Sequence, residues 1–279
     1  MGVRQIKCFL CMLGLALLTL GGCAQKNGEE KLLDKSAQTL YQNAEYMLEV
    51  DKDRKKAVEL FAEVERLYPY SEWSKRALIM QAYVYHKDRK YEEARSAGER
   101  FIEFYPGDED APYALYLVAL SYYDQVDDVG RDQAITFEAL TGLRNVIDQY
   151  PNSDYARLAA LKFDLTFDHL AAKEMEVGRY YLKRSNFTAA INRFRSVVQN
   201  YQNTAYTAEA LHRLVEAYTT LGLQNEAQTA GAILGYNYQS SPFYQDSYKL
   251  LTTNGMKPEV GGSNWLRDVY RQMIKGEWL

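Results

Sequence analysis

The side chains that most often do chemistry are few and scattered in this chain. His86, His169 and His212 are its only histidines, and no two of them have the spacing of metal ligands. Asp127 and Asp128 form a carboxylate pair suited to acid-base chemistry, but their polar surroundings favour a solvated loop. Neither a P-loop nor a dinucleotide-binding glycine pattern is present. We therefore expect a protein that is not an enzyme and needs no metal or cofactor.

One cysteine has an informative position. Residues 1–22 run from two basic residues through an apolar stretch to small residues, which is the order of a secretory signal peptide. The end of this segment, "LGGC" from Leu20 to Cys23, resembles the lipobox of bacterial lipoproteins. That resemblance implies cleavage before Cys23 and lipid on its sulfur, and Ala24 in the next position implies delivery to the outer membrane. The alternative is an ordinary signal peptide followed by a chance cysteine.

The chain left after cleavage has 257 residues, a formal charge of −6 and no second cysteine. It therefore has neither a disulfide nor a cysteine pair for a metal, and its core alone must stabilise it. An acidic balance gives no reason to expect nucleic acid as a partner. Residues 23–34 are polar and predict a short lipidated tether before the folded part.

A fixed spacing recurs along the folded part. Five tyrosines mark it, and three of them precede proline: Tyr68, Tyr105, Tyr150, Tyr201 and Tyr238. Eleven residues before each tyrosine stands an alanine, namely Ala57, Ala94, Ala139, Ala190 and Ala227. Four residues before each stands an apolar residue, namely Val64, Phe101, Val146, Val197 and Leu234. Nine residues after the first four stand Ala77, Ala114, Ala159 and Ala210. The sequence thus predicts five internal repeats.

Each repeat is predicted to be a pair of antiparallel helices. The stretch "YEEARSAGERFIEFYP" places Ala94, Ala97 and Phe101 on one helical face, and its proline disfavours continuation. The caps expected for the helices that follow are Ser71, Asp108, Ser153 and Thr204. Neither helix buries its apolar side alone, so the pairs must stack. The predicted fold class is all-α, an α-solenoid of about five long helix pairs plus a C-terminal helix.

The repeats resemble tetratricopeptide repeats. The signature positions of that family are matched by Ala82, Tyr85, Ala94 and Pro106 in the second copy and by Gly178, Tyr181, Ala190 and Phe194 in the fourth. The boundary tyrosines are 37, 45, 51 and 37 residues apart, against about 34 in the family. The helices are therefore longer, with insertions near 124–136 and 163–187. We predict N-terminal repeats in 35–162, C-terminal repeats in 163–250, and a linker and amphipathic helix in 251–279.

The lipobox, the short tether and the enlarged third and fourth repeats together resemble the BamD family, lipoproteins of the outer-membrane β-barrel assembly machine. The resemblance implies a scaffold anchored in the outer membrane through Cys23 and facing the periplasm. Its implied partners are the periplasmic domain of BamA, other Bam lipoproteins and the C-terminal segments of unfolded outer-membrane proteins. The alternative is an exported tetratricopeptide scaffold that coordinates cell-envelope constriction or peptidoglycan synthesis, which the lipobox disfavours.

Two surfaces are predicted on the repeats. A groove for substrate peptides is expected at Tyr46, Arg76, Tyr83, His86, Lys87, Tyr113, Tyr116 and Tyr123. Tyrosines with a few cations suit an extended peptide that has aromatic side chains and a terminal carboxylate, although core packing is an equal alternative for any one tyrosine. By resemblance, BamA docks on the later repeats, at Arg179, Lys183, Asn192, Arg193 and Arg195. A solvated charged face is the alternative there.

The C-terminal segment leaves two possibilities open. Residues 254–264 are rich in glycine and proline and predict a linker. After it, one helical stripe is formed by Trp265, Leu266, Val269, Tyr270, Met273 and Ile274. This helix either caps the open end of the solenoid or binds another subunit.

Overall fold

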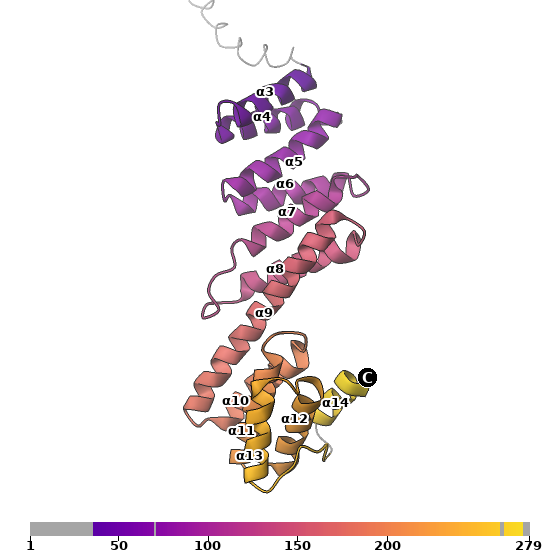
Figure 1. Cartoon of the computed structure of the whole chain (residues 1–279). Coiled ribbons are helices and arrows are strands. Elements are labelled where there is room, and N and C mark those ends of the chain that lie inside the picture. The colour runs from indigo at the N-terminus through magenta and orange to yellow at the C-terminus, as the bar shows by residue number, and fades with distance from the viewer. Residues whose placement is uncertain (1–35, 70, 263–264, 276–279) are drawn as a thin grey trace, which may run out of the picture. The chain divides into compact units, whose positions relative to one another are not determined.

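The computed structural model describes residues 36–69, 71–262 and 265–275, and every regular element in this part of the chain is a helix (Figure 1). The signal peptide, Cys23 and the tether lie outside the described residues. The helices are α3 (Ala37–Glu49), α4 (Arg54–Leu67), α5 (Glu72–Lys87), α6 (Tyr91–Phe104), α7 (Ala111–Tyr123), α8 (Ala134–Gln149), α9 (Asp154–Lys183), α10 (Phe187–Asn200), α11 (Thr207–Thr220), α12 (Gln224–Asn237), α13 (Pro242–Thr253) and α14 (Trp265–Lys275). The fold class is all-α, an α-solenoid of helix pairs, as the repeat pattern predicts.

The five tyrosines end the second helix of five successive pairs. Tyr68, Tyr105, Tyr150, Tyr201 and Tyr238 are the C-caps of α4, α6, α8, α10 and α12, with φ between −133° and −130° in every copy. Each donates its backbone N–H to the carbonyl of the apolar residue four positions earlier. One backbone geometry therefore closes all five pairs, and the predicted repeat boundaries are confirmed.

The small residues of the repeat lie where helices touch. All nine alanines of the two repeated positions are completely buried, as are the five apolar residues four positions before the tyrosines. The fourth pair has an even closer approach, because a Cβ built on Gly178 of α9 would lie 2.5 Å from the ring of Phe194 on α10. Side chains larger than these would force the packed helices apart.

Two of the four predicted helix caps are correct. Ser71 and Ser153 accept hydrogen bonds from the backbone N–H of Ser74 and Ala156 and begin α5 and α9. Asp108 and Thr204 are not caps, because α7 and α11 begin two residues later than the pattern predicts. Their side chains close the preceding turn instead: Asp108 accepts from the N–H of Asp110, and Thr204 donates to the carbonyl of Tyr201.

The chain divides into two compact units, Met1–Pro106 and Gly107–Leu279. In unit 1, α3 packs against α4 and α5, and α5 against α4 and α6, around a core that includes Leu40 and Phe61. In unit 2, α9 packs against α7, α8 and α10, and α11 packs against α10, α12 and α13. The predicted division at 162/163 falls inside α9, a continuous helix of 30 residues. That helix joins the third and fourth pairs because it contacts both α8 and α10.

The two predicted insertions have different structures. The second insertion forms the extension of α9, whereas residues 124–133 form a loop between α7 and α8. Lys173 of α9 donates its ammonium to the carbonyl of Gly130 at 2.8 Å and so ties this loop to α9.

The C-terminal segment packs on unit 2. Of the predicted linker, residues 254–262 are described. They contact α12, where Gly261 and Thr229 exchange hydrogen bonds of 3.1 Å and Gln228 donates to the carbonyl of Lys257. After it, α14 packs against α12 and buries Leu266 and Val269 in the same core. Of the two roles left open by the sequence, the structure shows the capping one.

Candidate functional site

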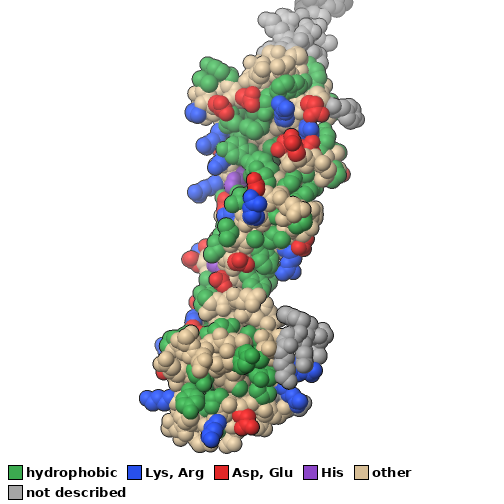
Figure 2. Space-filling model, turned by 45° about the vertical axis from the view of Figure 1, so that its right-hand side comes forward, with side chains coloured by type: hydrophobic (Ala, Val, Ile, Leu, Met, Phe, Trp, Pro, Cys, Tyr) green, Lys and Arg blue, Asp and Glu red, His purple; other side chains and the backbone are tan. Residues whose placement is uncertain are grey.

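A cavity of about 440 Å³ opens in unit 1 between the end of α3, the start of α4 and the C-terminal half of α5. Its lining combines apolar and charged side chains: Leu48, Glu49, Lys52, Arg54, Met80, Tyr83, Val84 and Lys87. Three cations face one carboxylate here, and Figure 2 shows several Lys and Arg side chains along one edge of this unit. The cavity therefore suits a ligand with an apolar part and a negative charge.

The turn before α4 positions two of these cations. Lys52 has a left-handed backbone with φ 56°, which reverses the chain, and the Asp53 carboxylate accepts from the N–H of Lys56 at 2.9 Å and starts α4. Arg54 then donates to Asp88 at 3.0 Å, so the α3–α4 turn is tied to the α5–α6 turn. Lys87 lies 5.5 Å from the centre of the Tyr83 ring, a cation–π contact on the cavity wall.

Two residues of the predicted groove, Tyr83 and Lys87, line this cavity. The other three in unit 1 lie elsewhere: Tyr46 is exposed on α3, the Arg76 guanidinium stacks on Trp73 at 5.2 Å, and His86 contacts the edge of Tyr91. Sequence reasoning missed Lys52 and Arg54. The repeat could have indicated Lys52. Tyr46 and Tyr83 are 37 residues apart, and so are Lys52 and Arg89, which means that two successive repeats have a basic residue at the same turn position.

The remaining groove tyrosines belong to unit 2, and the prediction for one of them is wrong. Tyr116 is only 8% exposed and packs in a core cluster with Leu143, so it does not line a groove. Tyr113 packs against the ring of Tyr155 at 5.0 Å, and Tyr123 holds the Lys162 ammonium 4.1 Å from its ring centre. Core packing, the alternative weighed from the sequence, is what Tyr116 does.

Asn192 and Arg193 of the predicted docking surface lie together on α10. With Glu174 and Tyr181 they line a cavity of about 310 Å³ in unit 2. The Arg193 guanidinium lies 3.2 Å from the Glu174 carboxylate, and its side chain is 45% exposed. Arg193 is therefore accessible while already held by a carboxylate of the same chain.

Comparison with known proteins gives the family. Residues 33–233 match the family YfiO, described as outer membrane lipoprotein. The "Outer membrane protein assembly factor BamD" of Caulobacter vibrioides is 45% identical over 88% of this chain and 81% of its own length. The proteins of the same name from Rickettsia prowazekii and Neisseria meningitidis serogroup A are 44% and 32% identical, over 84% and 83% of this chain and 92% of each relative. The chain belongs to the BamD family.

A solved structure is also similar. The crystal structure of PilW, a type IV pilus biogenesis factor, matches 75% of this chain and 96% of its own, with 15% identity and a TM-score of 0.34. Such a low score carries no argument about this BamD-family chain.

The other predicted docking residues of this BamD-family chain have different surroundings. Arg179 donates to both carboxylate oxygens of Glu209, with Nε to Oε1 at 2.8 Å. Arg195 stacks on Trp265 at 4.9 Å and donates to Gln199. Both guanidinium groups therefore stabilise unit 2 itself, whereas Lys183 is exposed at the end of α9 and forms no ion pair within the described residues.

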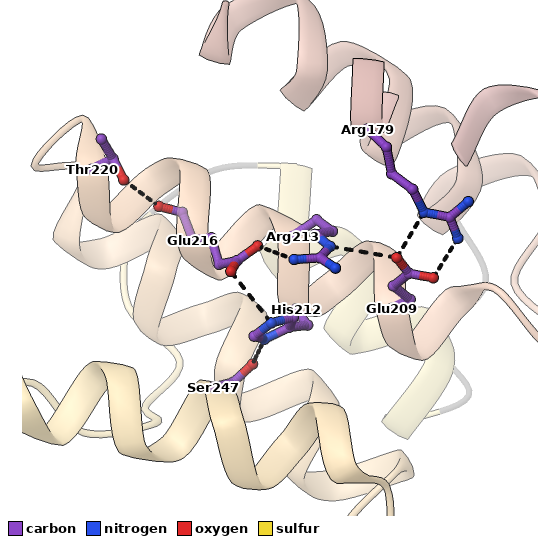
Figure 3. Close-up of polar contacts among 7 residues, drawn as sticks. All are labelled: Arg179, Glu209, His212, Arg213, Glu216, Thr220 and Ser247. Carbon is purple, nitrogen blue, oxygen red and sulfur yellow. Dashed lines mark hydrogen bonds and ion pairs between the residues drawn. The ribbon is translucent and has the colours of Figure 1, made fainter. Parts of the chain in front are cut away.

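A polar network in unit 2 extends from the exposed Arg179 to the buried Ser247 and was not predicted (Figure 3). Glu209 also pairs with Arg213, which donates to Glu216 at 2.7 Å, and Glu216 lies 3.6 Å from His212. The hydrogen bond from Arg179 is the main cause that lowers the pKa of the Glu209 carboxyl. The i, i+3 and i, i+4 spacings on α11 were readable from the sequence.

The network ends in a pair that no local spacing predicts. His212 Nδ1 and Ser247 Oγ are joined by a hydrogen bond of 2.8 Å between α11 and α13, and Ser247 is completely buried. Burial is the main cause that lowers the pKa of His212, against the opposite effect of Glu216. A serine with no exposed surface is not a nucleophile for a substrate, so this pair joins helices.

The described part of the chain has neither a metal-binding cluster nor a helix suited to span a membrane. No group of three or more His, Cys, Asp or Glu side chains there is arranged to hold a metal ion. Among the described helices, none has the length and apolar character needed to cross a membrane.

Proposed function

We propose that this chain is a non-catalytic outer-membrane lipoprotein scaffold that works in the assembly of outer-membrane proteins. Family membership supports the proposal, because the relatives covered over most of their length are named outer membrane protein assembly factors. A lipid on Cys23 would hold the chain at the periplasmic face of the outer membrane. The alternative, a scaffold for envelope constriction or peptidoglycan synthesis, has no comparable support.

Within that role, we propose that the unit 1 cavity binds the C-terminal segments of unfolded outer-membrane proteins. The observation that carries this proposal is the lining itself: an apolar floor of Leu48, Met80 and Val84 beside the cations Lys52 and Lys87. An aromatic side chain fits the floor, while a terminal carboxylate is attracted by the cations. Neither cation forms an ion pair with another described residue, so a ligand carboxylate displaces no carboxylate of the chain.

A peptide-binding experiment tests the cavity. A fluorescent peptide ending in phenylalanine, with a free carboxylate, should bind the mature chain, and the same peptide with a C-terminal amide should bind about tenfold more weakly, the usual effect of losing a charged hydrogen bond. Lys87→Gln should remove most of this difference. Arg76→Gln is the matched control, because Arg76 lies outside the cavity. Equal binding of the two peptides would refute the proposed carboxylate site.

We also propose that Asn192, Arg193 and Lys183 of unit 2 form the surface that docks the periplasmic domain of BamA. Support comes from the exposure of Arg193 and its position in an open cavity. A carboxylate of the partner would replace or join Glu174 at the guanidinium, whose planar donors suit two carboxylates at once.

A further inference from the structure

Two neighbouring turns of unit 1 form what we name the basic edge. It consists of Lys52, Arg54, Lys55, Lys56, Lys87, Arg89 and Lys90, all of them exposed. The residues 52–56 and 87–90 contain two carboxylates, Asp53 and Asp88, so these two turns have a net charge of +5 on a chain whose total is −4. The bond from Arg54 to Asp88 shows that the two turns lie side by side. Positive charge is therefore concentrated on one edge of an acidic protein (Figure 2).

Several cations of the basic edge occupy positions that disfavour them. Arg54, Lys55 and Lys56 fill the first turn of α4, which contains no acidic residue. The positive end of the helix dipole disfavours cations there. Lys52 and Arg89 both have left-handed backbones, with φ of 56° and 59°, a region that favours glycine. Folding stability therefore gives no reason for Lys52, Lys55 or Arg89.

The carboxylates of the two turns do not neutralise the edge. Asp53 is occupied as the cap of α4, Asp88 pairs with Arg54, and Glu59 pairs with Lys56. Among the described residues, Lys52, Lys55 and Arg89 form no ion pair. Most of the positive charge is thus available to an external anion.

We propose that the basic edge lies against an anionic phospholipid surface. This inference rests on the lipid anchor of the proposed function. Twelve residues lie between Cys23 and the first described residue, Ser36, and the thirteen Cα–Cα steps from one to the other reach at most about 45 Å. The tether therefore keeps unit 1 close to the membrane surface. Exposed lysines and arginines next to an anchor bind anionic headgroups electrostatically.

The arrangement of the cations favours a lipid surface over an acidic polypeptide. Lys55, Lys56, Arg89 and Lys90 do not line the cavity, and all four are exposed. Spread over two turns, they match the diffuse charge of a headgroup layer. Lys52, Arg54 and Lys87 belong both to the edge and to the cavity, so a peptide bound in the cavity lies next to the lipid surface.

Vesicle co-sedimentation tests the proposal. The mature chain with Cys23→Ser, which takes no lipid, is mixed with phosphatidylcholine vesicles with or without about 30 mol% phosphatidylglycerol. We expect binding only to the anionic vesicles, decreasing as salt is raised. Each basic residue near the surface contributes about fivefold to partitioning, so Lys55→Glu with Arg89→Glu should lower it at least about 25-fold. The control Lys249→Glu with Lys257→Glu makes the same charge change at exposed positions of unit 2.

Three outcomes would overturn the proposal. The first is no preference for anionic vesicles, and the second is equal losses in the two double variants. The third is a Lys55→Glu with Arg89→Glu variant that loses binding to soluble polyglutamate but keeps its binding to vesicles. The last would assign the edge to an acidic polypeptide. The peptide-binding experiment shows whether the lipid proposal fails by itself or together with the proposed peptide site in the cavity. Tyr83→Ala should weaken peptide binding and leave vesicle binding unchanged, while Lys55→Glu with Arg89→Glu should do the reverse.

Discussion

The two units build the same helix pair but treat their cations differently. In unit 2, Arg179 and Arg193 pair with Glu209 and Glu174 of the same chain. In unit 1, Lys52 and Lys87 line an open cavity and form no ion pair within the described residues. A partner of unit 1 therefore supplies a missing countercharge, whereas a partner of unit 2 exchanges with a carboxylate already in place.

The two surfaces should therefore respond differently to salt and to the fit of a partner. Binding at unpaired, exposed cations gains from every new charge pair and is weakened by salt. Binding at Arg193 includes the cost of loosening Glu174, so its net gain depends on how closely the partner fits. The same scaffold thus provides one surface suited to diffuse or variable anions and one suited to a defined partner.

Reversal of Arg193 should have the largest effect on the unit 2 surface. Arg193→Glu places a carboxylate beside Glu174 and removes the donors offered to a partner. We expect the affinity for the periplasmic domain of BamA to fall by about 2 kcal/mol or more, roughly 30-fold. Surface plasmon resonance with that domain measures it.

The charge swap Arg193→Glu with Glu174→Arg sharpens this prediction. It keeps an internal ion pair, so the fold should be preserved while binding stays weak. Unchanged affinity of the single variant would contradict the docking role, and recovery in the swap would show that the partner needs the pair and not the position of the guanidinium.

The packing of the helix pairs differs between the units at one repeated position. Gly178 and Phe194 of unit 2 occupy the repeat positions that Ala82 and Gly98 occupy in unit 1. Gly178→Ala should destabilise unit 2 by about 1–3 kcal/mol, because its Cβ meets the Phe194 ring at 2.5 Å. Hydrogen exchange should show faster opening of α9 and α10 than of α5 and α6.

A substitution at the equivalent position of unit 1 should also lower stability, but for a different reason. Ala82→Gly removes a methyl group from a tight contact and a good helix former, at about 1 kcal/mol. If Gly178→Ala were neutral, the close approach of α9 and α10 would be relieved by a small helix shift, and the compared positions would not be equivalent.

The sequence predicts the fold through features that repeat. The boundary tyrosines and buried alanines obey local rules of helix ends and close packing, so five copies reinforce one another. The predicted caps fail at Asp108 and Thr204, because a polar side chain near a helix start also closes turns. The long α9 was predicted as extended helices, but its continuity across two pairs depends on contacts with both α8 and α10.

The candidate sites are predictable only in part. Tyr83 and Lys87 follow from the repeat, whereas Tyr116 was misplaced because core and groove tyrosines have the same local pattern. The partners of Arg179 and His212 come from residues 30 and 35 positions away. No helical periodicity encodes such pairings, which depend on how the pairs stack.

Acid should affect unit 2 through His212. Because burial lowers its pKa below the ordinary value of 6.5, the folded state binds the proton less well than the unfolded state. Stability is therefore fully present above the unfolded pKa and decreases as the pH falls below it. Urea unfolding at about pH 7.5 and about pH 5.5 should show lower stability in acid.

The His212→Gln variant tests this assignment. Glutamine keeps a polar partner for Ser247 but does not titrate, so its stability should change less between the two pH values. The other charged groups around the site, Glu216, Arg213, Asp246 and Glu209, remain in both proteins. An identical pH dependence in the variant would assign the acid effect to those carboxylates.

The smallest expected effect concerns one turn position that both units share. Two residues before the second helix of a pair, the backbone is left-handed at Lys52 and Arg89 in unit 1 and at Ser185 and Gly222 in unit 2. Lys52→Gly should stabilise the chain by about 0.5–1 kcal/mol, and Gly222→Lys should destabilise it by about as much. Urea midpoints measure both changes.

The effect of Lys52→Gly on ligand binding tests whether Lys52, with its left-handed backbone, serves a function. If Lys52 serves the cavity and the basic edge, Lys52→Gly gains stability but weakens both peptide and anionic-vesicle binding. Gly222→Lys should lose stability and gain neither, because its turn lies between the exposed Leu221 and Leu223, with no cation beside it. If Lys52→Gly is more stable and still binds both ligands normally, Lys52 has no role in binding, and the strain of its backbone has no functional explanation.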